Sequence, residues 1–173
     1  MKLSKKISLS AILIAISVII MLLGSFLETV TLSSAAIASI CVMVAVVELG
    51  YKYAAMVYVA ASFLAFVLLP VKDPAIFFAA SFGFYPIVKD LLEKIRSKIS
   101  YFYKGVVFTA AFAFLYFVAI KFLAPQVDLM KYLFVIYPIA LIVFFIFDYA
   151  FSKLTHSYCF HLRKRLGIDR LLK

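Results

Sequence analysis

The sequence predicts an all-α membrane protein in which six transmembrane helices form a bundle and an amphipathic helix follows at the C-terminus. Composition is the first reason: 67% of the 173 residues are hydrophobic, 15% are charged and the mean hydropathy is +1.14, far from the balance of a soluble domain. The second reason is that apolar runs of about 17 to 25 residues, long enough to span a bilayer, recur along the chain. We therefore expect residues 1–173 to form a single integral membrane domain.

Each apolar run is expected to be a helix, because the bilayer interior offers no partner for unpaired backbone groups and the runs are too long for barrel strands. The first run is too long for a secretory signal peptide and lacks a small-residue cleavage pattern, so we expect it to be retained. The predicted spans are residues 7–24, 30–49, 53–70, 75–92, 104–123 and 131–151.

Three local features shape these elements. The turn "LGYK" at 49–52 is so short that the second and third spans must pack as antiparallel neighbours. Gly83 and Pro86 lie within one turn and predict a kinked or locally opened fourth span. The tail, residues 152–173, alternates Leu and Ile with Arg and Lys, which is typical of an amphipathic helix on a membrane surface.

The net charge of +10 is distributed as in a membrane protein rather than a nucleic-acid-binding protein. In the predicted topology all of the 18 basic residues except Lys72, Lys121 and Lys131 lie on one side. By the positive-inside rule this side is the cytoplasm, so both termini are expected to be cytoplasmic. We expect membrane lipids to contact the basic side chains, and we expect no nucleic-acid partner.

Sequence signatures of enzymes are absent. There is no Gly-Lys dipeptide and hence no Walker A loop for nucleotide phosphates, and neither a G-x-S-x-G nor an H-E-x-x-H motif occurs. Cys41 lies in the second span and Cys159 in the tail, so no disulfide is expected. His156, Cys159 and His161 do not share one helical face. We therefore predict a protein without catalytic residues, cofactor or metal.

Three ionisable residues in the spans need an explanation, because a charge in hydrocarbon costs a few kcal/mol. Glu48, Lys89 and Asp148 all lie near the cytoplasmic ends of their spans. They either reach the membrane interface or pair with one another, or they form a proton relay. In "KDLLEKIRSK", Lys89 and Glu93 are four residues apart, as are Asp90 and Lys94, so we expect the fourth helix to continue beyond its span into the cytoplasm.

The outer rim carries balanced charge, which suits a neutral, zwitterionic or aromatic solute. Tyrosine rings within the spans are surfaces on which a flat solute stacks, and the break between Gly83 and Pro86 favours a cavity nearby. We expect a pocket that opens outward and is lined by spans four to six. The candidate solute-binding residues are Glu28, Lys72, Tyr85, Lys121, Asp128 and Tyr137.

A stripe of small residues marks the first span. In "SLSAILIAIS", Ser8, Ala11 and Ala15 recur at steps of three and four, so they share one face of a helix. Small residues allow another backbone to approach closely. The stripe therefore either docks onto a partner protein or packs inside the bundle.

These features together resemble the substrate-binding S component of energy-coupling factor transporters, the vitamin and micronutrient importers of prokaryotes. The resemblance lies in the short chain, the six spans with both ends inside, the basic N-terminus, the pair Ala11 and Ala15, and the turn within "ELGYKYAAMVYVAASFLAFVL". It implies a small-molecule solute captured outside a prokaryotic cytoplasmic membrane. It also implies that the first helix docks onto a transmembrane coupling subunit powered by ATPase subunits.

Two other functions fit the same pattern. Cell-shape scaffold proteins of the MreD type are also small six-span proteins, and they hold partners together without a ligand. A stand-alone small permease is the second alternative. An outward cavity would favour transport, whereas a fully packed bundle would favour the scaffold.

Overall fold

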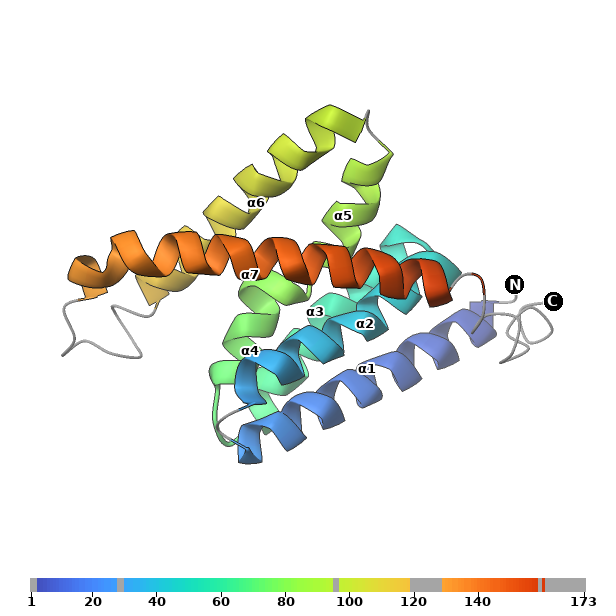
Figure 1. The fold of residues 1–173 in the computed structure, drawn as a ribbon. Coiled ribbons are helices and arrows are strands. Elements are labelled where there is room, and N and C mark those ends of the chain that lie inside the picture. The colour runs from blue at the N-terminus through green and yellow to red at the C-terminus, as the bar shows by residue number, and fades with distance from the viewer. Residues whose placement is uncertain (1–2, 28–29, 95–96, 119–128, 159, 161–173) are drawn as a thin grey trace. The chain divides into compact units, whose positions relative to one another are not determined.

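The computed structural model describes residues 3–27, 30–94, 97–118, 129–158 and 160 of the chain. Every regular element in these residues is a helix (Figure 1), which confirms the predicted all-α class. The chain divides into two compact units, which we call the N-terminal unit (residues 2–115) and the C-terminal unit (residues 116–173).

Five helical segments among the described residues are long and apolar enough to cross a membrane, as in a multi-pass membrane protein. They correspond to predicted spans one to four and to the sixth. The helix over most of the fifth predicted span is not among them, so the count of six stays a prediction. The five segments are Leu3–Phe26, Thr31–Leu49, Tyr51–Leu68, Asp73–Glu93 and Tyr137–Ser157.

Three long helices form the base of the N-terminal unit: α1 (Leu3–Phe26), α2 (Thr31–Leu49) and α3 (Tyr51–Leu68). Each of them packs against the other two. α1 begins before the predicted start at residue 7, because its N-terminal lysines are good helix formers and a helix need not end with its apolar run. α3 ends before the predicted residue 70, since Leu69 is extended (ψ 134°), as a residue before proline prefers.

A single residue, Gly50, connects α2 to α3. Its φ is +88°, in the left-handed region that favours glycine, and its N–H donates to the Ala45 carbonyl at 3.1 Å. This tight turn makes α2 and α3 antiparallel neighbours, which confirms the interpretation of the "LGYK" stretch. We call this end of the N-terminal unit the Gly50 end.

The fourth segment is not one regular helix. It comprises α4 (Asp73–Phe77), a π-helical turn η2 (Phe78–Phe82) and α5 (Tyr85–Glu93). Pro86 lies in the first turn of α5, where the missing N–H of proline costs no helical hydrogen bond. The predicted break near Gly83 and Pro86 is therefore confirmed.

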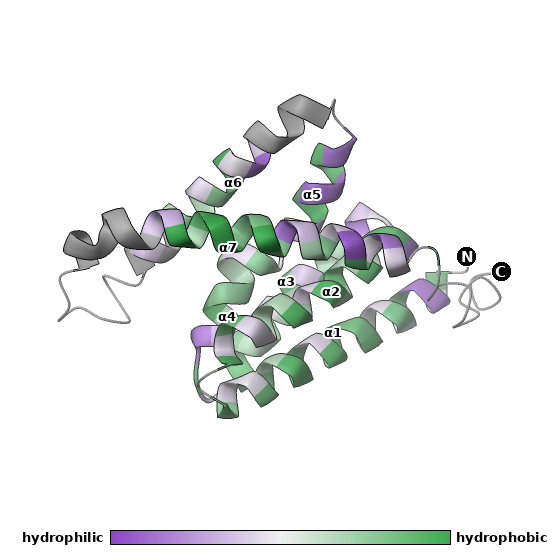
Figure 2. Ribbon diagram, in the orientation of Figure 1, coloured by the Kyte–Doolittle hydropathy of each residue, from purple (hydrophilic) through white to green (hydrophobic). Residues whose placement is uncertain are grey.

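The core of the N-terminal unit is packed around small residues spaced seven apart. Seven residues are close to two helical turns, so residues at this spacing form a seam along one face. These buried residues are Ser10, Ser17 and Gly24 in α1, Ala38 and Ala45 in α2, and Ala54 and Ala61 in α3. Figure 2 shows that α1 to α4 are largely apolar, whereas much of α5 is hydrophilic.

Two further helices follow, α6 (Ser97–Val118) and α7 (Leu129–Ser157). α7 continues past the predicted end at residue 151. The hydroxyls of Ser152 and Thr155 each donate to the carbonyl four residues earlier at 2.9 Å, so these polar side chains are accommodated within the helix. The rest of the predicted C-terminal amphipathic helix lies outside the described residues and stays a prediction.

Candidate functional site

α1 carries two different stripes of small residues. Ser10, Ser17 and Gly24 face into the N-terminal unit and are buried. The sequence-predicted stripe, Ser8, Ala11 and Ala15, is exposed on α1. In the sequence, a seven-residue spacing of small residues marks the first stripe. Close packing within the N-terminal unit thus uses the first stripe, and among the described residues the second stripe is exposed.

The buried stripe brings α1 and α2 into close contact. The Ser17 hydroxyl donates to the Leu13 carbonyl at 2.9 Å and lies 3.4 Å from the Ala38 carbonyl of α2. A Cβ atom added at Gly24 would lie 2.0 Å from Ser34 Oγ, closer than any real contact. The two helices can therefore pack this closely only because residue 24 has no side chain.

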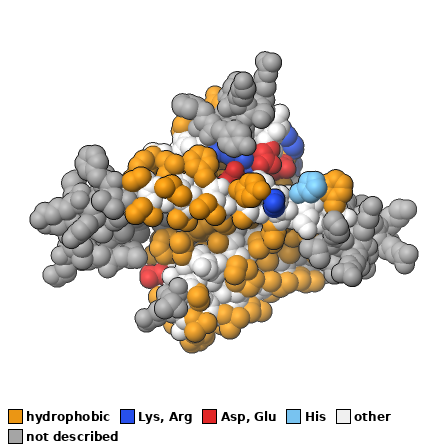
Figure 3. Space-filling view, viewed as in Figure 1, with side chains coloured by type: hydrophobic (Ala, Val, Ile, Leu, Met, Phe, Trp, Pro, Cys, Tyr) orange, Lys and Arg blue, Asp and Glu red, His pale blue; other side chains and the backbone are white. Residues whose placement is uncertain are grey.

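Large apolar residues flank the exposed stripe. Ile12, Ile16 and Ile19 of α1 are all exposed, and Figure 3 shows apolar side chains over much of α1. The small residues beside them form a low strip on an apolar helix face. Such a face is compatible with lipid or with a partner helix.

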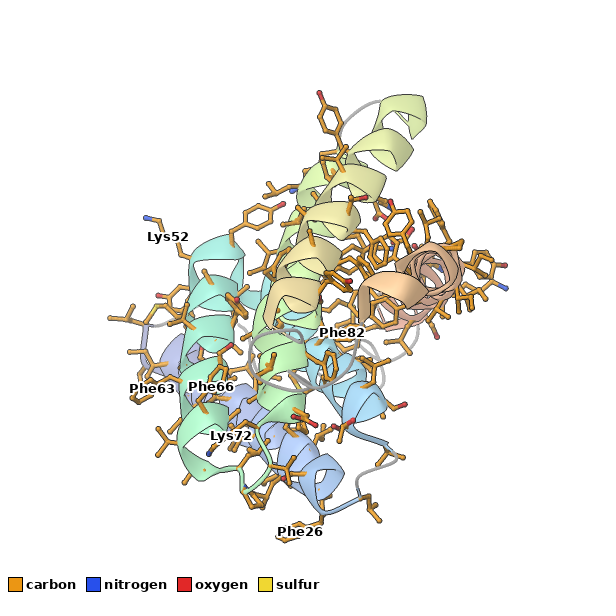
Figure 4. The ribbon with its side chains drawn as sticks, turned by 90° about the vertical axis from the view of Figure 1, so that its left-hand side faces the viewer. Phe26, Lys52, Phe63, Phe66, Lys72 and Phe82 are labelled. Carbon is orange, nitrogen blue, oxygen red and sulfur yellow. The ribbon has the colours of Figure 1, made fainter. Side chains whose placement is uncertain are left out.

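At the end opposite Gly50, the candidate solute-binding residue Lys72 binds backbone atoms. Its ammonium donates to the carbonyls of Phe66 at 2.7 Å and Leu69 at 2.6 Å. These lie in the last turn of α3, where carbonyls lack helical partners and a cation is favourable. Figure 4 shows Lys72 near this end of α3 and Lys52 at the other. The loop is also tied to α1, since the Val71 N–H donates to Ser25 Oγ at 3.1 Å.

The other candidate solute-binding residues are distributed along the chain. Tyr85 is buried at the start of α5, with 4% of its surface exposed, and the Lys89 ammonium lies 5.8 Å from its ring centroid. Tyr137 is half-buried in α7 of the C-terminal unit. Glu28, Lys121 and Asp128 lie outside the described residues. Of the six candidates, the N-terminal unit thus holds Lys72 and Tyr85 among its described residues.

Charged residues gather around the end of α5, where Figure 3 shows red and blue side chains together. Glu93 Oε1 lies 3.4 Å from the Lys89 ammonium and 3.1 Å from that of Lys104 in α6. The side chains of Lys89 and Lys104 are only 4% and 5% exposed, whereas that of Glu93 is 46% exposed. Glu93 thus pairs with Lys89 across one helical turn. The contact with Lys104 could not be predicted from the sequence, because the separation of Lys104 from Glu93 along the chain does not indicate an ion pair.

A second polar contact joins α5 to the Gly50 end of α3. The Tyr51 hydroxyl donates to the Asp90 carboxylate, and the Lys94 ammonium pairs with the same carboxylate at 3.2 Å and with the Tyr51 hydroxyl. The hydrogen bond with Tyr51, and then that with Asp90, raises the pKa of Lys94 above its ordinary value. Lys94 therefore remains charged throughout the physiological range.

Glu48 and Asp148, which the sequence analysis named together with Lys89, differ in burial. Glu48 of α2 is half-buried, and its Oε2 atom is buried. Asp148 of α7 is 5% exposed. Within the described residues, no group of three or more His, Cys, Asp or Glu side chains is placed to hold a metal ion.

Comparison with known proteins adds no relative. No protein-family model, curated protein or solved structure matches the chain.

Proposed function

We propose that this protein is the substrate-binding membrane subunit of an importer of the energy-coupling factor type. It captures a vitamin-like or other small solute outside the cell and docks through α1 onto a transmembrane coupling subunit powered by partner ATPases. The observation that carries the proposal is the exposure of Ser8, Ala11 and Ala15 on a helix that already packs its own unit through another small-residue stripe.

The chemistry of this face favours a helix as the partner. Lipid tails are as apolar as large side chains, so helices associate in a membrane through close van der Waals packing rather than through the hydrophobic effect. Small residues beside Ile12 and Ile16 let a second backbone approach, while the two isoleucines pack along one side of it. A coupling subunit that presents an apolar helix fits this surface.

The distribution of lysines supports the orientation that the proposal requires. Lys6 lies 5.2 Å from the Tyr53 ring centroid, so α1 begins at the Gly50 end, where Lys52 and Lys94 also lie. Lys72 lies at the opposite end of α3. By the positive-inside rule we assign the Gly50 end to the cytoplasm and the Lys72 end to the outside of a prokaryotic cell.

A double substitution on α1 tests the docking face. Ala11→Trp combined with Ala15→Trp fills the strip, so co-purification with a co-expressed coupling subunit and its ATPases should fall at least about tenfold, as expected when close helix packing is lost. Solute binding to the isolated subunit should be unchanged. The readout is the amount of coupling subunit retained per subunit after affinity purification.

The matched control is Ala55→Trp, which adds the same side chain to an exposed alanine of α3 and should leave co-purification intact. Unchanged co-purification of the double variant would contradict docking through this face. A thermal-shift screen of vitamins, nucleobases and amino acids identifies the solute. If folded protein binds none of them, the scaffold function of the MreD type is favoured.

A further inference from the structure

Tyrosines and lysines surround the first turn of α3 at the Gly50 end. Tyr51, Lys52 and Tyr53 are consecutive, so their side chains point in different directions around the helix. The Lys6 ammonium of α1 lies 5.2 Å from the Tyr53 ring centroid, and the Lys94 ammonium at the end of α5 lies 4.7 Å from that of Tyr51. Each ring thus holds a lysine from another helix by a cation–π contact. Lysines from three parts of the chain therefore lie at this end of α3.

Two of these three lysines carry charge that no nearby carboxylate balances. Lys94 pairs with Asp90 at 3.2 Å. Lys52 is exposed and Lys6 is half-buried, and among the described residues neither of them forms an ion pair. Lys6 lies over the ring of the residue that follows Lys52, and both side chains are long and flexible. The two ammonium groups can therefore converge on one negatively charged group.

An exposed apolar stripe continues from Lys52 along α3. Met56, Val59 and Phe63 follow Lys52 at steps of four, three and four residues, so the four side chains share one face of the helix. The three apolar side chains are 63%, 62% and 68% exposed, and Figure 4 shows Lys52 and Phe63 on the same side of α3. From Lys52 to Phe63 the helix rises about 16 Å, close to half of the hydrocarbon core of a bilayer. The stripe is therefore as long as one leaflet is deep.

We propose that Lys6, Lys52 and the apolar stripe bind one anionic phospholipid from the leaflet at the Gly50 end. The two ammonium groups contact the headgroup phosphate, and an acyl chain lies along Met56, Val59 and Phe63. A headgroup with net negative charge fits best, because choline or ethanolamine would bring a further cation to the two lysines. The tyrosines on either side of Lys52 lie at headgroup level, where this residue type is enriched. Basic residues in general attract anionic lipids, whereas this surface binds a single lipid at a defined place.

Native mass spectrometry of the purified full-length protein tests the lipid site. The protein in detergent is titrated with phosphatidylglycerol or with phosphatidylcholine that has the same acyl chains, and the affinity for the first bound lipid is measured. Lys52→Gln should weaken phosphatidylglycerol binding about fivefold, the factor expected for one lysine beside an anionic headgroup. Lys6→Gln combined with Lys52→Gln should weaken it about tenfold or more. Binding of phosphatidylcholine should be unchanged in both variants.

The matched control is Lys153→Gln in α7, which removes another exposed lysine whose ammonium lies over a tyrosine ring, 5.2 Å from the Tyr149 centroid. This variant should bind phosphatidylglycerol as the wild type does. An equal loss in Lys52→Gln and Lys153→Gln would show attraction by net charge alone and overturn the site. Equal affinity of the wild type for the two lipids would also overturn it.

A competition experiment distinguishes a lipid from a free phosphate group. Soluble glycerol phosphate, added at the same concentration as phosphatidylglycerol, should not displace the bound lipid, because it has no acyl chain to cover the stripe on α3. Displacement by glycerol phosphate would mean that the lysines bind the phosphate group alone, and the lipid site would be wrong. If the double variant fails to fold, Lys52→Gln decides the proposal, since Lys52 is exposed and lies outside the core.

Discussion

Gly24 shows how one missing side chain determines the distance between two helices. An added Cβ atom would meet both Oγ and Cβ of Ser34, at 2.0 and 2.2 Å. Rotation of the serine hydroxyl relieves the first contact but not the second, because Cβ is fixed to the backbone of α2. A larger residue therefore forces the two helices apart.

We expect Gly24→Ala to destabilise the protein by about 1 to 3 kcal/mol, the usual cost of overpacking a close contact. The measurement is thermal unfolding in detergent. Gly105→Ala is the matched control, because a Cβ atom there meets nothing within 4 Å, and alanine is the better helix former by about 1 kcal/mol. If both variants have the same stability, the close approach of α1 and α2 at Gly24 is incorrect.

At the scale of elements, polar contacts attach α5 to its neighbours where apolar packing ends. Tyr51, Asp90 and Lys94 join α5 to α3, and Glu93 joins it to Lys104 of α6. The raised pKa of Lys94 determines how the first contact depends on pH. A base whose pKa is higher in the folded state stabilises that state fully below its unfolded pKa, and this contribution is lost as pH rises through the folded value.

The stability difference between the wild type and Lys94→Met should therefore be constant between about pH 6 and about pH 9 and shrink only above about pH 10. Thermal unfolding across this range measures it. Lys52→Met, an exposed lysine at the same end, is the reference for the general effect of removing one positive charge. A difference that disappears on going from pH 9 to pH 6 would contradict the hydrogen-bonded role of Lys94.

At the scale of the whole molecule, the proposed function depends on proteins encoded elsewhere. The chain has no Walker A motif, and Lys89 is engaged with Glu93 at the Gly50 end of the N-terminal unit. Buried charge at this position has a structural partner and does not by itself indicate a proton relay. In the proposed function, the energy for transport comes from partner ATPases.

We expect the protein alone in liposomes to bind solute without accumulating it, even under an imposed proton or sodium gradient. Accumulation of radiolabelled solute should begin on co-reconstitution with a coupling subunit and its ATPases, and only with ATP on the cytoplasmic side. The Lys94→Met protein serves as a folded comparison. Gradient-driven accumulation by the lone chain would instead identify a stand-alone permease, and Glu48 and Asp148 would be the first residues to neutralise.

Composition and local pattern alone determined the helical class, the apolar segments, the turn at Gly50 and the break near Pro86. These properties depend on hydropathy, on glycine's access to positive φ and on proline's missing N–H, which act over a few residues. Tertiary structure decided which small residues pack inside. The side chains of Ser10 and Ser17 are about as small as those of Ser8 and Ala15. Only the neighbouring helices therefore determine which face of α1 is buried. Tertiary structure also decided the partners of Tyr51 and Lys104, because a side chain's contacts with other helices depend on how those helices pack and not on its neighbours in the chain.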